Sequence, residues 1–252
     1  MSTHQRGIQT VDSAGEILNL ICNSPHALSL SEIAQMMQLP PSSAYKYLVS
    51  LLRTELIQRD ESSLTYRAGS LSLRLGLAKM RHDLVLLEAR AALTKLADKY
   101  QVNVFASMWS NVNGPTVVFY KETAGFFHIG FRLGIRLSLH RTTTGRLFAA
   151  YMERQSLQPY LVKLDIKEQA ALQDPELIKY CMQIREQGYS HLSGTPTPGL
   201  STYAVPVLDE QEKLIMTLSA FHQIDQLDQE KEHSLIADLK RIALQFKEKS
   251  HG

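Results

Sequence analysis

Side chains that can hydrogen-bond to nucleic acid gather in the residues just after Pro41. Ser42 and Ser43 carry hydroxyls that can reach phosphate oxygens or base edges. Tyr45 can contact a sugar or the methyl group of thymine, and Lys46 can bind a guanine or a phosphate. None of these side chains alone defines a base sequence. Together they predict a surface that contacts double-stranded DNA.

The distribution of charge favours the same part of the chain. The 252 residues carry a formal net charge of only +2, but residues 1–40 hold one cation against three acids, whereas residues 41–82 hold seven cations against three acids. Arg59 and Arg67 lie in the second segment and are expected to neutralise backbone phosphates. A basic, solvated surface without a nucleic-acid partner is the alternative interpretation.

Two helices are predicted ahead of these side chains. Apolar residues recur every three or four positions across 8–21, which is the spacing of one buried helical stripe. The members of this stripe are Val11, Ala14, Leu18 and Ile21. A second helix is expected to start at a capping box formed by Ser29 and Glu32 and to continue to residue 37.

A third helix is expected to carry the candidate DNA-contacting residues. Leu39-Pro40-Pro41 ends the second helix, and the fixed φ of proline suits the first turn of the next one. The positions predicted to face inward are Ala44, Leu48, Leu51 and Leu52. The positions predicted to face outward are Ser42, Lys46, Val49 and Arg53. The outer face of this helix is therefore polar and cationic.

A β-hairpin completes the first predicted domain. The runs 56–59 and 64–67 are short and β-like, and Asp60-Glu61-Ser62-Ser63 joins them. Three helices followed by a hairpin make a winged helix-turn-helix domain, which we assign to residues 1–70.

The chain beyond the hairpin is predicted to form a linker and a larger domain. Residues 71–83 are expected to form a linker helix, although the alternating leucines of 71–77 are also compatible with a strand. In the second domain, residues 84–252, helices are predicted over 84–100, 145–153, 155–163, 174–187 and 228–247. Strands are predicted over 102–109, 116–121, 202–208 and 213–221. The fold class is therefore α+β.

The sequence lacks the motifs that are typical of several classes of protein. Cys22 and Cys181 form no CxxC pair and are expected to be buried thiols. There is no HExxH, GxSxG or P-loop motif, so we expect no metal, no cofactor and no catalytic residues, and a hydrolytic enzyme is a weak alternative. The longest aliphatic run, 84–87, is too short to cross a bilayer, which predicts a cytoplasmic protein without a membrane partner.

Several segments, in order along the chain, resemble the isocitrate-lyase-regulator (IclR) family of transcription regulators. In the first domain these segments are Ile8-Gln9-Thr10-Val11, Leu30-Ser31-Glu32-Ile33-Ala34, residues 39–48 and Tyr66-Arg67-Ala68-Gly69. In the second domain they are residues 136–146, Arg185-Glu186-Gln187-Gly188-Tyr189, Pro198-Gly199-Leu200 and Ala204-Val205-Pro206-Val207. The resemblance runs nearly end to end.

The resemblance implies a GAF-like domain that binds a small-molecule effector and forms a homodimer or homotetramer. Its pocket would lie between a central sheet and the helix that starts near Gly145, where hydroxyls and backbone N–H groups favour a carboxylate. Matching positions are Thr143, Thr144, Leu192, Thr202, Ser219 and Phe221. The implied function is that of a repressor or activator of a catabolic operon, bound to an inverted-repeat operator.

The chain departs from the family pattern at several positions. Many members carry cysteine where Arg141 and Thr202 stand and serine where Phe221 stands, so this pocket is expected to be less polar. Gln38 and Glu55 occupy turns where glycine is common in the family, which leaves the geometry of both turns open.

Other interpretations of the same residues are kept open. Thr143 and Thr144 could serve only as helix caps. Four phenylalanines could surround an aromatic effector or belong to the core, namely Phe126, Phe127, Phe131 and Phe221. A ligand sensor whose winged helix binds another protein is the second functional alternative.

Overall fold

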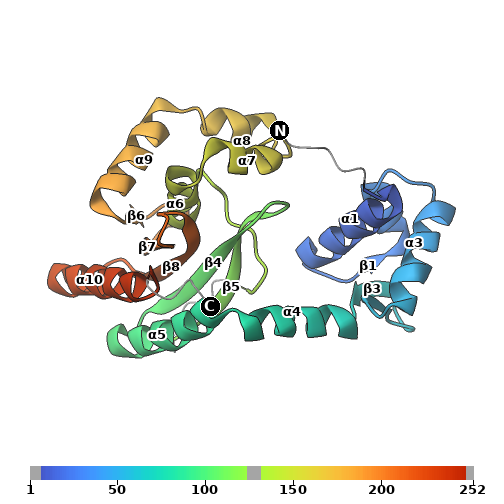
Figure 1. Ribbon diagram of the computed structural model, residues 1–252, viewed down its shortest axis with the longest axis horizontal. Coiled ribbons are helices and arrows are strands. Elements are labelled where there is room, and N and C mark those ends of the chain that lie inside the picture. Colours follow the sequence, from blue (N-terminus) through green and yellow to red (C-terminus); the bar gives the residue numbers. More distant parts are fainter. Residues whose placement is uncertain (1–6, 124–131, 248–252) are drawn as a thin grey trace. The chain divides into compact units, whose positions relative to one another are not determined.

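The computed structural model describes residues 7–123 and 132–247 (Figure 1). Backbone contacts divide the chain into two compact units, Met1–Asp83 and Leu84–Gly252. Each unit contains buried hydrophobic clusters of its own. Within the described ranges, no helix combines the length and the apolarity that a membrane span requires.

The N-terminal unit is a winged helix-turn-helix domain, as the sequence predicts. Its helices are α1 (Gln9–Asn23), α2 (Leu30–Met36), α3 (Pro41–Arg53) and α4 (Ser70–His82). Its strands, β1 (Leu28–Ser29), β2 (Ile57–Arg59) and β3 (Thr65–Ala68), form one antiparallel sheet in the order β1-β3-β2. The buried core of this unit consists of Ile17, Leu28, Ile33, Leu48, Leu51, Ile57 and Tyr66.

Local sequence signals set the ends of α2 and α3. Ser29 Oγ accepts a hydrogen bond from the backbone N–H of Glu32 at 3.3 Å, and Glu32 Oε2 accepts one from the backbone N–H of Ser29 at 2.8 Å. This confirms the capping box. Pro41 occupies the first turn of α3. Gln38 and Glu55 adopt φ angles of 53° and 56°, so both turns keep the left-handed geometry that glycine favours.

Two predicted burials in α1 are wrong. The side chain of Val11 is 63% exposed, whereas Ile17 is fully buried. Val11 lies in the first turn of α1, and the helix packs on the core from Ala14 onward. Cys22 is exposed because a helix turns by about 100° per residue, which carries it away from the side on which Ile21 packs.

One element of this unit decides between two predicted alternatives, and another was not predicted. Residues Ser70–His82 form a helix, so the strand interpretation of 71–77 is wrong. Strand β1 has no counterpart in the prediction, because two residues are too few to show alternation.

The C-terminal unit is an α+β domain built on a five-stranded antiparallel sheet, which confirms the predicted fold class. Its strands are β4 (Asn103–Ser110), β5 (Gly114–Lys121), β6 (Ser190–Ser193), β7 (Leu200–Leu208) and β8 (Leu214–Gln223), in the order β5-β4-β8-β7-β6. Its helices are α5 (Leu84–Tyr100), α6 (Thr143–Tyr151), α7 (Arg154–Leu161), α8 (Ile166–Ala171), α9 (Pro175–Gln187) and α10 (Gln229–Gln245).

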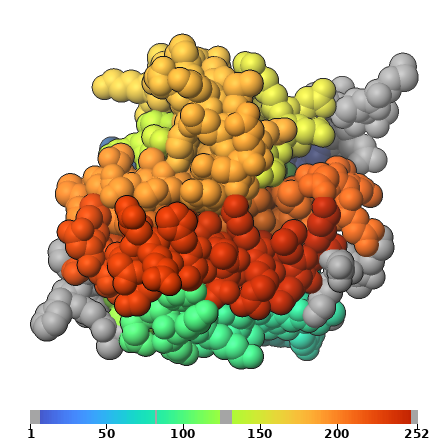
Figure 2. All heavy atoms as spheres, turned by 90° about the vertical axis from the view of Figure 1, so that its left-hand side faces the viewer, coloured from blue at the N-terminus to red at the C-terminus, as the bar shows by residue number. Residues whose placement is uncertain are grey.

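Helices cover both faces of this sheet. Helix α6 packs against β7 and β8, and α9 packs against α6. Helices α5 and α10 pack against each other and against the sheet (Figure 1). Figure 2 shows α10 extending across its side of the unit, with α5 beside it. We call the two sides of the sheet the α6 face and the α10 face.

Most of the predicted elements of this unit form close to their expected positions. Gly114 adopts a φ of 70° in the turn between β4 and β5, as the Asn-Gly pair predicts. Helix α6 begins at Thr143, two residues before the predicted start, because Thr142 caps it. Helix α8 and strand β6 have no counterpart in the prediction, since such short segments show no periodicity.

Candidate functional site

Helix α3 separates its apolar and polar residues as the sequence predicts. Ala44 and Leu48 are fully buried against the core. Ser42 and Lys46 are exposed on the opposite side, and Tyr45 is 49% exposed. Ser43 is half-buried. The helix therefore presents a hydroxyl, a phenol and an ammonium group to solvent along one turn, while its inner side anchors it.

The hairpin after α3 forms the predicted wing. Asp60 closes its turn by accepting hydrogen bonds from the hydroxyl of Ser62 and from the backbone N–H groups of Ser63 and Ser62. These bonds, the hydroxyl bond first, hold the pKa of the Asp60 carboxyl well below its usual range. Arg59 pairs with Tyr66 across the strands, and its guanidinium lies 5.8 Å from the centre of the Tyr66 ring.

The two wing arginines lie on opposite faces of the hairpin. Arg59 is directly opposite Tyr66, whereas Arg67 is opposite Gln58, and neighbouring positions in a strand point to opposite sides. Both arginines are exposed. Among the described residues, no carboxylate lies within ion-pair distance of Lys46, Arg59 or Arg67. Three cations are therefore available to an anionic partner.

A small cavity opens between the α6 face of the sheet and the start of α6. Its lining residues are Phe105, Leu137, Thr142, Thr143, Thr144, Pro196, Thr197, Leu200, Thr202 and Phe221. Its volume is about 70 Å³, whereas a buried apolar cavity that binds benzene measures roughly 150 Å³. A ring-sized ligand requires this cavity to widen.

The cavity brings together four of the six residues matched by resemblance. Thr143, Thr144, Thr202 and Phe221 line it. Ser219 joins them through its hydroxyl, which lies 3.0 Å from the hydroxyl of Thr144.

Leu192 is placed differently from these residues. It does not line the cavity, and its carbonyl accepts a hydrogen bond from Thr202 Oγ1 at 3.2 Å. Its contribution is therefore to orient the side chain of Thr202.

The start of α6 differs in detail from the expectation. Thr142 is the capping residue, and its Oγ1 accepts a hydrogen bond from the backbone N–H of Gly145 at 2.9 Å. The Gly145 N–H group is therefore already bonded. Thr143 and Thr144 are not caps, and no described residue accepts from their backbone N–H groups. Because helix starts attract anions, these two N–H groups are the ones suited to a carboxylate.

Gly145 allows the close approach that positions these threonines. A side-chain carbon added at Gly145 would lie 2.0 Å from the carbonyl oxygen of Ser138. Only glycine therefore lets α6 approach this segment so closely. On the same segment, His140 Nδ1 lies 3.1 Å from Ser138 Oγ, as expected for a histidine that hydrogen-bonds locally.

Aromatic rings form the apolar side of the cavity. Phe221 lies 6.1 Å from Phe105, centre to centre, and stacks on Tyr120 at 6.4 Å. Phe126, Phe127 and Phe131 lie outside the described residues.

The sequence prediction missed six of the ten residues that line the cavity, one of which is the capping residue Thr142. Phe105, Leu137 and Leu200 are buried side chains whose apolar type suits an ordinary core equally well. Pro196 and Thr197 lie in a loop between strands, where no periodic pattern assigns a direction. For Phe105, the alternation along β4 was the one signal that could have placed it.

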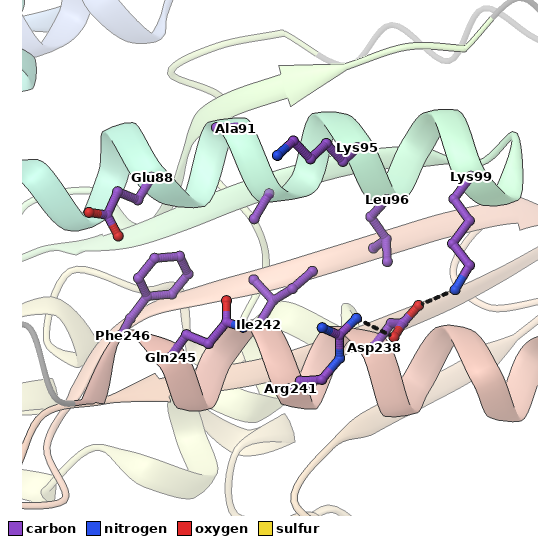
Figure 3. Close-up of a pocket in the computed structure, with 11 residues that line it drawn as sticks. Glu88, Ala91, Lys95, Leu96, Lys99, Asp238, Arg241, Ile242, Gln245 and Phe246 are labelled. Carbon is purple, nitrogen blue, oxygen red and sulfur yellow. Dashed lines mark hydrogen bonds and ion pairs between the residues drawn. The ribbon is translucent and has the colours of Figure 1, made fainter.

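A second hollow lies between α5 and α10 and has a different character. This groove has a volume of about 450 Å³, and none of the predicted site residues lines it. Three of its charged groups already bind one another: Asp238 accepts hydrogen bonds from Lys99 and Arg241, each at 2.7 Å (Figure 3). Among the described residues, no group of three or more His, Cys, Asp or Glu is arranged to hold a metal ion.

Comparison with known proteins agrees with this architecture. Residues 10–61 match the IclR helix-turn-helix domain, and residues 80–248 match the bacterial transcriptional regulator IclR C-terminal domain. The chain is 30% identical over 208 residues to the HTH-type transcriptional regulator BhcR of Paracoccus denitrificans, covering 81% of this chain and 73% of the relative.

Solved structures share the fold across nearly the whole chain. The IclR transcriptional regulator from Alicyclobacillus acidocaldarius superposes with a TM-score of 0.80 at 22% identity, covering 96% and 98% of the two chains. An IclR homologue from Microbacterium hydrocarbonoxydans, complexed with 4-hydroxybenzoate, superposes with a TM-score of 0.70 at 16% identity, covering 94% and 97%. The chain therefore belongs to the IclR family of bacterial transcription regulators, with a DNA-binding helix-turn-helix domain ahead of the ligand-binding C-terminal domain of that family.

Proposed function

We propose that α3 and the wing bind double-stranded DNA directly. The residues that would make the contacts are Ser42, Ser43, Tyr45, Lys46, Arg59 and Arg67. The supporting observation is the exposed outer face of α3, where Lys46 has no ion-pair partner among the described residues. A helix of this kind fits the major groove, which is about 12 Å wide. The arginines of the wing would bind phosphates on either side of it.

The proposed assembly is a pair of such domains on an inverted repeat. A two-fold homodimer, alone or within a homotetramer, presents two recognition helices to two half-sites related by the same symmetry. Because its partner is DNA, we propose that the chain works in the cytoplasm, as a repressor or an activator of a catabolic operon.

Charge reversal tests the DNA interface. Lys46→Glu and Arg59→Glu, made in the full chain, should each weaken binding to DNA fragments selected by the wild-type chain by tenfold or more at ~0.1 M salt. Each should also lower the slope of log affinity against log salt by about 1. Lys213→Glu, at an exposed lysine of the other unit, is the matched control. Unchanged affinity across the salt series for both variants would favour a protein partner instead.

We propose that the cavity binds a small organic acid as effector. The two unbonded N–H groups at the start of α6 suit a carboxylate, and the walls formed by Phe105, Leu137 and Phe221 suit an apolar or aromatic body. The solved relative in complex with 4-hydroxybenzoate is consistent with this class. Occupation of the cavity would change DNA affinity by favouring one arrangement of the chain, in proportion to the difference in affinity between arrangements.

The proposed role of this cavity is sensing rather than catalysis. Thr144 and Ser219 hydrogen-bond each other, and the described lining residues include no imidazole, carboxylate or thiol. A hydroxyl nucleophile needs a base within hydrogen-bond reach. The relative BhcR is a transcription regulator.

Calorimetric titration of the full chain with aliphatic, sugar and aromatic acids tests the effector class. At least one acid should bind, and saturating acid should raise the unfolding temperature, because a ligand of the native state stabilises it. Thr144→Val should lower the affinity for the acid that binds. The affinity for DNA in the absence of acid should stay unchanged. Absence of binding across all three classes would contradict the proposed effector.

A further inference from the structure

Two buried hydroxyls on the α6 face lack hydrogen-bond partners. Ser107 on β4 and Thr217 on β8 are both fully buried. They lie directly opposite each other in the sheet. No described residue offers a hydrogen bond to either hydroxyl. A buried polar group without a partner is destabilising, and such groups in native proteins call for an explanation.

These hydroxyls lie next to the cavity. Phe105, which lines the cavity, and Ser219, which bonds the lining residue Thr144, form the neighbouring pair along the same two strands. Positions two residues apart in a strand point to the same face, so Ser107 and Thr217 follow this pair at a distance of about 7 Å. Beyond them, Trp109 packs against Phe148 of α6, with ring centres 5.7 Å apart.

The order along the sheet is therefore an apolar cavity, a hydroxyl pair that is hydrogen-bonded, and a hydroxyl pair that is not. Ser219, which bonds Thr144, lies along β8 between the lining residue Phe221 and Thr217. Rotation of the Thr144 side chain away from Ser219 would open a way from the cavity toward Ser107 and Thr217. This would also supply the widening that a ring-sized ligand requires.

The chemistry of this inner end favours an uncharged polar group. Hydroxyls can donate to and accept from a ligand hydroxyl or a keto oxygen. A second carboxylate would be costly here, because neither Ser107 nor Thr217 has a cationic partner among the described residues.

We propose that Ser107 and Thr217 bind a hydroxyl or keto oxygen at the far end of the effector, opposite the carboxylate held at the start of α6. This inference rests on the proposed function of the cavity and specifies its ligand. The effector is then an acid with a second polar group about one ring length from its carboxylate. The hydroxyl pair distinguishes such an acid from its unsubstituted analogue.

Paired titrations of the full chain test the proposal. The probes are 4-hydroxybenzoate against benzoate, and 6-hydroxyhexanoate against hexanoate as a flexible pair. The wild-type chain should prefer at least one hydroxylated acid by about tenfold, which corresponds to one or two hydrogen bonds. Ser107→Ala and Thr217→Val should each bring that preference close to one, while affinity for the unsubstituted acid stays unchanged.

Ser190→Ala is the matched control. Ser190 is also fully buried and its hydroxyl also has no partner among the described residues. It lies on the same face but on strand β6, where it pairs with Ala204 of β7. Ala204 in turn pairs with Ser219 of β8, so one whole strand separates Ser190 from Ser219. Each of the three substitutions removes one unpaired hydroxyl and should leave the unfolding temperature equal or higher. Only Ser107→Ala and Thr217→Val should change the hydroxyl preference.

The outcomes distinguish a failure of the proposed effector class from a failure of the proposed hydroxyl site. Binding of none of the four acids overturns this inference, whereas the effector class is overturned only when the sugar acids also fail to bind. Equal affinity for hydroxylated and plain acids in the wild-type chain, or a preference that survives both substitutions, overturns the inference and leaves the acid-binding cavity standing. A crystal structure of the complex with only a water between Ser107 and Thr217, and the ligand hydroxyl elsewhere, also overturns it.

Discussion

The two faces of the C-terminal sheet treat their polar groups differently. On the α10 face, the His191 ring stacks on Tyr203 at 4.4 Å, and Ser201 hydrogen-bonds both of them. His222 Nδ1 lies 2.7 Å from the carbonyl oxygen of Gln223, while its Nε2 lies 3.6 Å from the Glu232 carboxylate, which is beyond hydrogen-bond distance. On the α6 face, buried hydroxyls remain without partners.

This contrast separates polar groups that stabilise the fold from polar groups that are available to a ligand. The same strands supply both faces, because side chains alternate along them: Thr202 and Phe221 point toward α6, whereas Tyr203 and His222 point toward α10. Polar groups that satisfy one another stabilise the native state. Polar groups that do not are the ones a bound molecule can satisfy.

The largest expected effect is on the α6 face, at Gly145. Gly145→Ala should lower the free energy of unfolding by about 3 kcal/mol, because the new carbon meets the Ser138 carbonyl at 2.0 Å. Chemical denaturation of the full chain measures this. Gly76→Ala, at a helical position with nothing within 4 Å, should instead stabilise α4 by about 1 kcal/mol. Equal effects at the two glycines would show that α6 is free to move away from Ser138.

On the α10 side, the next largest effect is expected at Asp238. Burial alone would raise the pKa of its carboxyl, but hydrogen bonds from Lys99, Arg241 and Tyr100 outweigh burial and lower the pKa to about 2. A carboxyl of the unfolded chain titrates near 3.9. Asp238→Asn should therefore cost about 2 kcal/mol of unfolding free energy at pH 7.

The pH dependence gives this effect a signature. Because the pKa is lower in the folded state, the contribution of Asp238 is complete above about pH 4 and is lost as the pH falls toward 2. The difference in stability between wild type and Asp238→Asn should shrink over that range. A difference that stays constant from pH 7 to pH 2 would contradict the assignment of Asp238 to a satisfied network.

The smallest expected effect concerns His191. Burial lowers the pKa of its imidazole, while Glu232 raises it and His222 lowers it further. The unfolded chain therefore takes up this proton first as the pH falls below about 6.5, and stability declines. His191→Gln should reduce the decline in the free energy of unfolding between pH 7 and pH 5 by less than about 1 kcal/mol. If the free energy of unfolding falls equally steeply with pH in the variant, His191 does not contribute to the pH dependence of the α10 face.

Elements with long periodic patterns or specific caps were predictable from the sequence. The capping box at Ser29 and the proline at the start of α3 placed the recognition helix, because both act within one turn of chain. The short elements β1, β6 and α8 were not predictable, since they show too few residues for a periodic pattern. Strands β2 and β3 are equally short but were predictable, because a recognisable turn joins them.

The residues of the two candidate sites also divide into predictable and unpredictable ones. Exposure of Lys46 and Arg67 follows from helix and strand periodicity. The cavity combines residues from β4, β7, β8 and α6, and no local pattern shows that Phe105 faces Thr144. Resemblance to the family supplied Thr144 and Ser219, whereas the unpaired state of Ser107 is a property of three-dimensional packing alone.

The pairing of the wing has a mechanical consequence for DNA recognition. If both wing arginines bind DNA as proposed, a hairpin that carries Arg59 on one side and Arg67 on the other would use both only by entering a groove edge-on, with a strand of the duplex flanking each side. Such an insertion would respond to the width of the groove rather than to the identity of its bases. Operators would then be ranked in part by duplex shape, including at positions that no side chain touches.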